Sequence, residues 1–176
     1  GEIKPLGRKA EFKHDSPNPI DPDAGLVFPF PILLKHDMIH KKLDKAREQF
    51  EASPFNNYVG PANPELLIIT SSVCTIYSRA AVERLGPHDR VGILKLGTTW
   101  PLPPKLLEKH MSSTDRILVV EETLPVMENN LRLVAMDLVA KIGNKTFYGK
   151  RDNTLPSVGE MDVELVTRTL AKLFDI

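Results

Sequence analysis

Alternation of strand-like and helix-like segments is the sequence feature that most restricts what this chain can fold into. From residue 64 onward, short apolar runs rich in β-branched residues alternate with amphipathic stretches. The expected strands are residues 65–70, 90–96, 115–121 and, more weakly, 145–148. The expected helices are residues 74–85, 103–111, 126–141 and 161–174. This order predicts an α/β domain with three layers, a Rossmann-like, mostly parallel sheet covered by helices on both faces.

The first 63 residues have a different character. Six prolines fall within residues 1–31, which predicts an irregular N-terminal Pro-rich arm that docks through apolar side chains such as Phe28 and Phe30. Apolar residues at near-helical spacing predict a helix over residues 32–52, and residues 56–64 are typical of a linker. We therefore divide the chain into a linker arm and helix, residues 1–63, and an α/β domain, residues 64–176.

Composition excludes several classes of protein. The 23 basic and 23 acidic residues balance, so no nucleic-acid or polybasic membrane partner is expected. A single cysteine cannot form an internal disulfide or hold an iron–sulfur cluster, and it suits a reducing, cytoplasmic setting. No apolar run approaches the roughly 20 residues that cross a bilayer. The chain begins at Gly1 rather than Met, and we expect that to reflect a cleaved tag or the excision of this segment from a longer protein.

Two isolated candidates for chemistry are expected to be structural. His36 and His40 share a helix face and can chelate zinc, but Asp37 replaces the glutamate of the zinc-protease pattern and no third ligand follows. We expect a solvated helix face there, without a functional metal. Cys74 opens a helix, where a thiol can become nucleophilic, although a role in close packing is the commoner use.

Polar residues also follow each expected strand, at the edge of a parallel sheet where ligands usually bind. Thr70, Ser71 and Ser72 can hold a phosphate or cap the next helix. Glu121 and Glu122 can bind a cation, act as acid and base, or cap amides and pair with Arg or Lys. Glu128 is placed for the positive end of its helix. The glycine-rich nucleotide motifs are missing.

Four segments together resemble the α subunit of indolepyruvate ferredoxin oxidoreductase. They are "LDKAREQFEASPFNN" (43–57), "PELLIITSS" (64–72), "VGILKLGTTWPLP" (91–103) and "RILVVEETLPVMENNLRLVA" (116–135). Their order and spacing cover roughly residues 32–142. The resemblance departs at Asn129 and Asn130, where the family often has an acid and a glutamine.

The resemblance implies that this chain is one domain of a longer subunit, like the C-terminal domain of transketolase. The parent enzyme is expected to decarboxylate arylpyruvates oxidatively, forming acyl-CoA and reducing ferredoxin. It is expected to use thiamine diphosphate, magnesium, [4Fe-4S] clusters and coenzyme A. No cofactor or catalytic residue is carried over to this chain, because the matching segments are not the family's cofactor motifs.

As a scaffold domain, the chain is expected to contact the other domains of its α subunit and a β subunit, with a homo-oligomer also open. The interface candidates lie in residues 97–103 and 121–128: Thr98, Thr99, Trp100, Glu121, Glu122 and Glu128. Two alternatives stay open. One is the same domain of another 2-oxoacid ferredoxin oxidoreductase or of a transketolase-like synthase. The other is a free-standing, flavodoxin-like phosphate- or nucleotide-binding module that uses residues 70–75 and 97–99.

Overall fold

A computed structural model describes residues 29–176 of the chain. The chain divides into two units after residue 41, and the second unit is residues 42–176; helix α1, Pro29–Phe50, runs through the boundary. Most of the expected N-terminal arm lies outside the described residues. The described helices include none that is both long enough and apolar enough to cross a membrane.

The second unit is built on a five-stranded sheet with the order β1-β3-β2-β4-β5. Its strands are β1 (Asn57–Val59), β2 (Leu66–Thr70), β3 (Val91–Lys95), β4 (Arg116–Val120) and β5 (Thr146–Tyr148). β2 pairs in parallel with β3 on one side and β4 on the other, and β5 pairs in parallel with β4. The expected mostly parallel sheet is confirmed.

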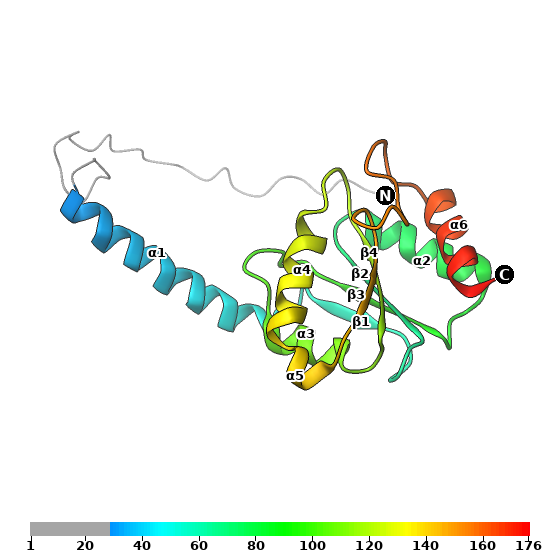
Figure 1. Cartoon of the computed structure of the whole chain (residues 1–176), viewed down its shortest axis with the longest axis horizontal. Helices are drawn as coiled ribbons and strands as arrows, with labels where there is room; N and C mark the ends of the chain where they lie inside the picture. The colour runs from blue at the N-terminus through cyan, green and yellow to red at the C-terminus, as the bar shows by residue number, and fades with distance from the viewer. Residues whose placement is uncertain (1–28) are drawn as a thin grey trace, which may run out of the picture. The chain divides into compact units, whose positions relative to one another are not determined.

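Helices cover both faces of the sheet, giving the expected three layers (Figure 1). One face carries α2 (Cys74–Leu85) and α6 (Val163–Phe174); the other carries α3 (Pro104–Met111), α4 (Val126–Asp137) and α5 (Val139–Ile142). Alternate residues of β2 enter the two cores: Leu66 and Ile68 pack on the α2 side, whereas Leu67 and Ile69 pack on the α4 side. A strand buried on both faces reads as a continuous apolar run, as this one does.

The expected linker at residues 56–64 is wrong in one respect, because it contains strand β1. β1 pairs antiparallel with β3 at the edge of the sheet. The ring of Tyr58 lies against Gly92, where any side chain would overlap it, and stacks on His110 with ring centroids 4.5 Å apart. These contacts are distant in sequence, so local composition does not reveal them. The domain boundary after residue 63 stays a prediction.

The single helix expected over residues 126–141 is also corrected. It is interrupted at Leu138, whose backbone (φ −94°, ψ 0°) leaves the helical region between α4 and α5. Gly143 then ends α5 with φ +73°, a conformation that glycine adopts without steric cost. All other expected elements begin and end within three residues of their predicted bounds.

Candidate functional site

The loops that follow β2, β3 and β4 converge at the carboxyl edge of the sheet. The chain leaves β2 towards β3 on one side and later returns to β4 on the other, so a topological switch point lies between β2 and β4. A hollow of about 290 Å³ opens there. Its lining includes Ser71, Thr99, Trp100, Glu121, Glu122 and Asn130. The prediction that residues 97–103 and 121–128 share one edge is confirmed.

Trp100 is the most prominent apolar side chain of this edge, with 63% of its surface exposed. A second hollow of about 420 Å³, along α4, shares Trp100 and Asn130 with the first. Leu124, Val126 and Leu133 are also exposed nearby, on α4 and the loop before it. The tryptophan therefore stands between two hollows on a largely apolar surface of the kind that partners cover.

Asn56 fixes the start of the loop that carries Trp100, residues 97–103, which we call the tryptophan loop. Its Oδ1 accepts hydrogen bonds from the backbone N–H of Gly97 (2.9 Å) and of Thr98 (3.1 Å). Its Nδ2 donates to the carbonyl of Phe50 (3.0 Å) and to the hydroxyl of Thr98 (2.8 Å). Thr98 is thus bonded within the chain, while Thr99 and Trp100 are exposed. The sequence reasoning missed Asn56, which carries no local signal of this role.

Glu121 caps the start of α4. Its carboxylate is 7% exposed and accepts hydrogen bonds from the backbone N–H of Met127 (2.7 Å) and of Glu128 (2.8 Å). Burial raises the pKa of this carboxyl, and the two backbone N–H groups act against that rise. Among the uses that the sequence left open for Glu121, the capping of amides is the one that the structure shows. Its role at an interface stays a prediction.

Glu122 lacks such strong partners. Its Oε1 accepts from the thiol of Cys74 at 3.7 Å, and its Oε2 accepts from the backbone N–H of Met161 at 3.5 Å, both near the limit for a hydrogen bond. Within residues 32–176, no ion pair involves Glu121 or Glu122. Glu122 therefore brings a carboxylate to the hollow without a cation of its own.

The environment of Cys74 makes it a poor nucleophile. The side chain is 1% exposed. Burial, followed by the adjacent Glu122 carboxylate, raises the pKa of the thiol to about 12. Since the thiolate is the reactive form, Cys74 stays protonated near neutral pH. The packing role expected as the commoner use fits this geometry.

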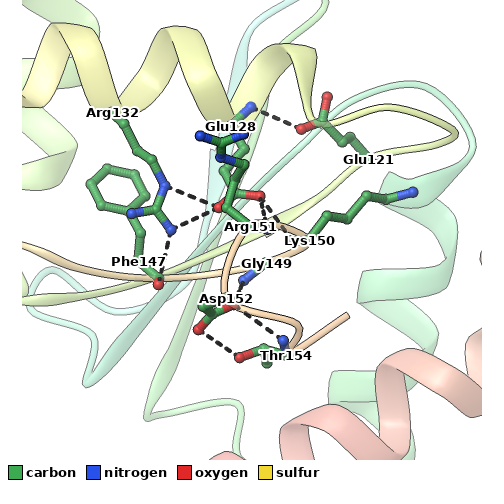
Figure 2. A network of polar contacts seen from close by, with 9 residues as sticks. All are labelled: Glu121, Glu128, Arg132, Phe147, Gly149, Lys150, Arg151, Asp152 and Thr154. Carbon is green, nitrogen blue, oxygen red and sulfur yellow. Dashed lines mark hydrogen bonds and ion pairs between the residues drawn. The ribbon is translucent and has the colours of Figure 1, made fainter. Parts of the chain in front are cut away.

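Glu128 follows Met127, which lines the hollow, and belongs to the polar network of Figure 2. It is 1% exposed and its Oε1 accepts two hydrogen bonds from the guanidinium of Arg132, at 3.0 and 2.8 Å. Its Oε2 accepts from the backbone N–H of Lys150 (2.9 Å) and of Arg151 (3.2 Å). A Cβ at Gly149 would lie 2.5 Å from that oxygen, so only glycine fits there. Glu128 thus fastens the loop after β5 to α4, and its interface role stays a prediction.

The start of α2 differs from expectation. The N-cap is Val73, and no side chain caps the helix, so the capping role expected for residues 70–72 is wrong. Thr70 ends β2 with a fully buried side chain, while Ser72 has φ +49°. Among the described residues, the buried hydroxyls of Thr70 and Thr75 have no hydrogen-bond partner. Binding of a phosphate by these residues stays untested.

His36 and His40 lie one helical turn apart on α1, as expected from their spacing. Their Nε2 atoms are 3.0 Å apart and both side chains are exposed. Among the described residues, no three histidine, cysteine, aspartate or glutamate side chains gather as a metal site would require. The absence of a functional metal at this pair stays a prediction.

Comparison with solved structures defines the class of fold. The structure superimposes with a TM-score of 0.52 on 2-oxoglutarate:ferredoxin oxidoreductase from Magnetococcus marinus, solved with 2-oxoglutarate, coenzyme A and succinyl-CoA bound. The match covers 85% of this chain and 24% of that chain, at 14% sequence identity. The chain therefore has the fold of one α/β segment of that larger oxidoreductase.

Comparison with curated proteins identifies the particular relative. The chain is 35% identical over 176 residues to indolepyruvate oxidoreductase subunit IorA of Pyrococcus abyssi, and 33% identical over 177 residues to IorA of Thermococcus kodakarensis. IorA of Pyrococcus horikoshii is 36% identical over 142 residues, which is 81% of this chain. No family model matches. The resemblance expected from the sequence is confirmed.

The first two of these matches cover 99% of this chain, yet the chain spans only about a quarter of the relatives' length. The sequence is thus similar, almost from end to end, to one segment of subunit IorA. This is the relation expected for a partial domain of the enzyme.

Proposed function

We propose that this chain serves as a non-catalytic scaffold domain within an indolepyruvate oxidoreductase. The observation that carries the proposal is the similarity of 99% of the chain to one quarter of subunit IorA. The whole protein would convert arylpyruvates to acyl-CoA with loss of carbon dioxide and reduction of ferredoxin, in the cytoplasm. In enzymes of this kind the cofactors carry out the chemistry, and the protein domains bind and orient the cofactors.

The side chains of this domain do not fit the cofactors expected of the whole enzyme. An iron–sulfur cluster needs several thiolates, and the single cysteine is buried and keeps its proton. No cluster of three acidic, histidine or cysteine side chains that suits a metal ion is found among the described residues. Thiamine diphosphate, magnesium and the [4Fe-4S] clusters would accordingly belong to other parts of the enzyme, as would coenzyme A.

The carboxyl edge of the sheet is the part of this domain best suited to contact the rest of the enzyme. Its exposed tryptophan and surrounding apolar side chains are costly to leave in water, because an aromatic side chain buries roughly 150–250 Å² when it is covered. Other domains of the same subunit, a β subunit or a second copy would supply the cover. The interface candidates Thr99, Trp100 and Glu122 all line the central hollow.

The alternative of a free-standing phosphate- or nucleotide-binding module is less well supported. Two unpartnered hydroxyls favour it, that of Thr70 at the end of β2 and that of Thr75 in the first turn of α2. However, two glutamates line the adjoining hollow, and carboxylates repel phosphate. The hollow also lies at the lower limit of the roughly 300–1,000 Å³ typical of small-molecule sites.

Purification of the protein that the complete gene encodes tests the proposal. We expect it to reduce ferredoxin when given indolepyruvate and coenzyme A under anaerobic conditions. The 176-residue chain alone should show no such activity, and inorganic phosphate or ADP should leave its thermal unfolding unchanged. Oxidoreductase activity of this chain, or its stabilisation by ADP, would contradict the scaffold role.

A further inference from the structure

The hollow beside Trp100 combines three features in one small space. Trp100 supplies an exposed aromatic surface, Glu122 supplies a carboxylate with weak internal partners, and Ser71 and Thr99 supply hydroxyl groups. The side chain of Glu121 adds a second carboxylate at the floor. No lysine or arginine lines this hollow. The ammonium of Lys150, whose charge acts to lower the pKa of Glu121, donates its hydrogen bond to the carbonyl of Thr123 (2.9 Å).

This charge distribution selects a cation as the occupant. A carboxylate that is brought into a covered interface without a partner is strongly unfavourable, so the surface that covers Glu122 must bring hydrogen-bond donors, and donors that carry a positive charge compensate the carboxylate best. A bare metal ion does not fit, because both carboxylate oxygens of Glu121 already accept hydrogen bonds from backbone N–H groups of α4. Glu122 alone supplies too few oxygen ligands for a cation. The apolar, aromatic wall favours a cation that also has a flat or apolar surface.

An arginine side chain meets these requirements better than a lysine side chain. Its planar guanidinium can stack on an indole ring while its N–H groups bind a carboxylate in a forked geometry. A lysine ammonium is a compact, strongly hydrated charge and loses more hydration on entry. The hollow of about 290 Å³ is also small enough for one side chain.

We propose that this hollow receives an arginine side chain from the remaining part of the longer, IorA-like subunit, stacked on Trp100 and paired with Glu122. The inference rests on the proposed scaffold function, in which this edge is covered by the rest of the enzyme. This chain spans about a quarter of the IorA relative, so the other three quarters of such a subunit offer many residues that can supply the arginine. The arginine would fix the orientation of the contact, since charged pairs at interfaces set register and exclude wrong partners.

Trp100 is the single tryptophan of the chain, so its fluorescence reports on this hollow alone. We expect acetyl-arginine amide to change that fluorescence saturably, with a dissociation constant of about 1–10 mM, as suits one stacked ion pair. Acetyl-citrulline amide, the uncharged analogue of nearly the same shape, should produce no saturable change. Higher salt should weaken the arginine response by screening it.

Variants locate the binding. Glu122→Gln should weaken arginine binding at least fivefold, whereas Glu83→Gln, an exposed acid on α2 that does not line the hollow, should leave it unchanged. Equal responses to arginine and citrulline, or no saturable response up to about 50 mM, would overturn the inference. So would unchanged binding by folded Glu122→Gln. If that variant does not fold, the arginine–citrulline comparison on the unaltered chain decides alone.

Oxidative footprinting of Trp100 separates this inference from the function on which it rests. If Trp100 is protected in the complete protein but the arginine probe does not bind, the carboxyl edge is a contact surface and the proposal of an arginine in the hollow is wrong. If Trp100 reacts as fast in the complete protein as in this chain, the covered edge itself is wrong. Protection together with selective arginine binding supports both.

Discussion

Two buried carboxylates, Glu121 and Glu128, hold the backbone around the candidate site. A charge buried without partners is strongly destabilising, and each of these acids is matched by donors from other segments. Glu121 takes two N–H groups of the first turn of α4, and Glu128 takes the guanidinium of Arg132 and two N–H groups after β5 (Figure 2). The ring of Phe147 lies 5.0 Å from the same guanidinium. Both acids therefore hold loops in place.

Glu128→Gln tests this role. The amide keeps the size of the side chain but removes the negative charge opposite Arg132 and turns one acceptor into a donor. We expect a loss of about 2–4 kcal/mol in the free energy of unfolding, as when one partner of a buried ion pair is removed. Urea denaturation of the 176-residue chain measures it.

Glu164→Gln is the matched control, because its ion pair with Arg84 is exposed on both sides. It should change the free energy of unfolding by no more than about 0.5 kcal/mol. Equal losses in the two variants would show that Glu128 is not a structural anchor.

The thiol of Cys74 gives a second test at the scale of single residues. Its raised pKa, about 12, keeps the thiol protonated in the folded protein at pH 8. We expect iodoacetamide to label native Cys74 at least about a hundredfold more slowly than the chain unfolded in guanidinium chloride. Comparable rates in the two states would contradict the burial and the shifted pKa.

The same pKa shift has a consequence for stability. Because the folded-state pKa is raised, the unfolded thiol ionises first as the pH increases. The contribution of Cys74 to folding is therefore complete below the ordinary thiol pKa, and it is lost as the pH rises from there towards about 12.

At the scale of elements, the segment between Phe50 and β2 decides how the tryptophan loop is held. Asn56 joins the end of α1 to residues 97 and 98, and β1 follows it at once along the edge of β3. The loop that carries Trp100 is thus positioned by a segment about forty residues earlier in the chain. The order of this loop depends on Asn56 as well as on the sheet.

Replacement of Asn56 by alanine should loosen this connection. It removes hydrogen bonds to Gly97, Thr98 and Phe50 and leaves partly buried backbone groups without partners. We expect a loss of about 2–4 kcal/mol in unfolding free energy and a lower fluorescence anisotropy of Trp100. Asn144→Ala, at an exposed position, should alter neither quantity. An unchanged anisotropy in Asn56→Ala would show that the loop is ordered without it.

The sequence predicted those elements whose signal is local. Apolar runs and helical spacing located β2 to β5 and most helices, and the parallel topology brought residues 97–103 and 121–128 to one edge. β1 escaped prediction because three residues between Asn56 and Gly60 form a strand only through Tyr58 and β3. The network of Glu128 escaped for a similar reason, since its donors at Lys150 and Arg151 lie more than twenty residues away.

At the scale of the whole molecule, the second unit has a buried sheet and one edge that stays incomplete. Each face of the sheet is covered by helices and has its own apolar core. The carboxyl edge, in contrast, exposes Trp100, Leu124 and Val126 around the acidic hollow. For this reason we propose that edge as the surface that contacts the rest of the enzyme.

Trp100→Ala in the complete protein tests that placement. If the edge is a contact surface, loss of its aromatic anchor should weaken association by about thirtyfold or more, because anchors of this kind contribute roughly 2 kcal/mol or more. Sedimentation of the complete protein over a range of concentrations measures assembly. Urea denaturation of the 176-residue chain should change by less than about 1 kcal/mol, since the exposed side chain contributes little to its own domain. Ile176→Ala, at a position that is also 63% exposed but follows α6 near the start of β4, at the opposite edge of the sheet, should leave both measurements unchanged. A destabilised domain with unaltered assembly would make Trp100 a residue of the domain's own packing, and the contact surface would then have to lie elsewhere.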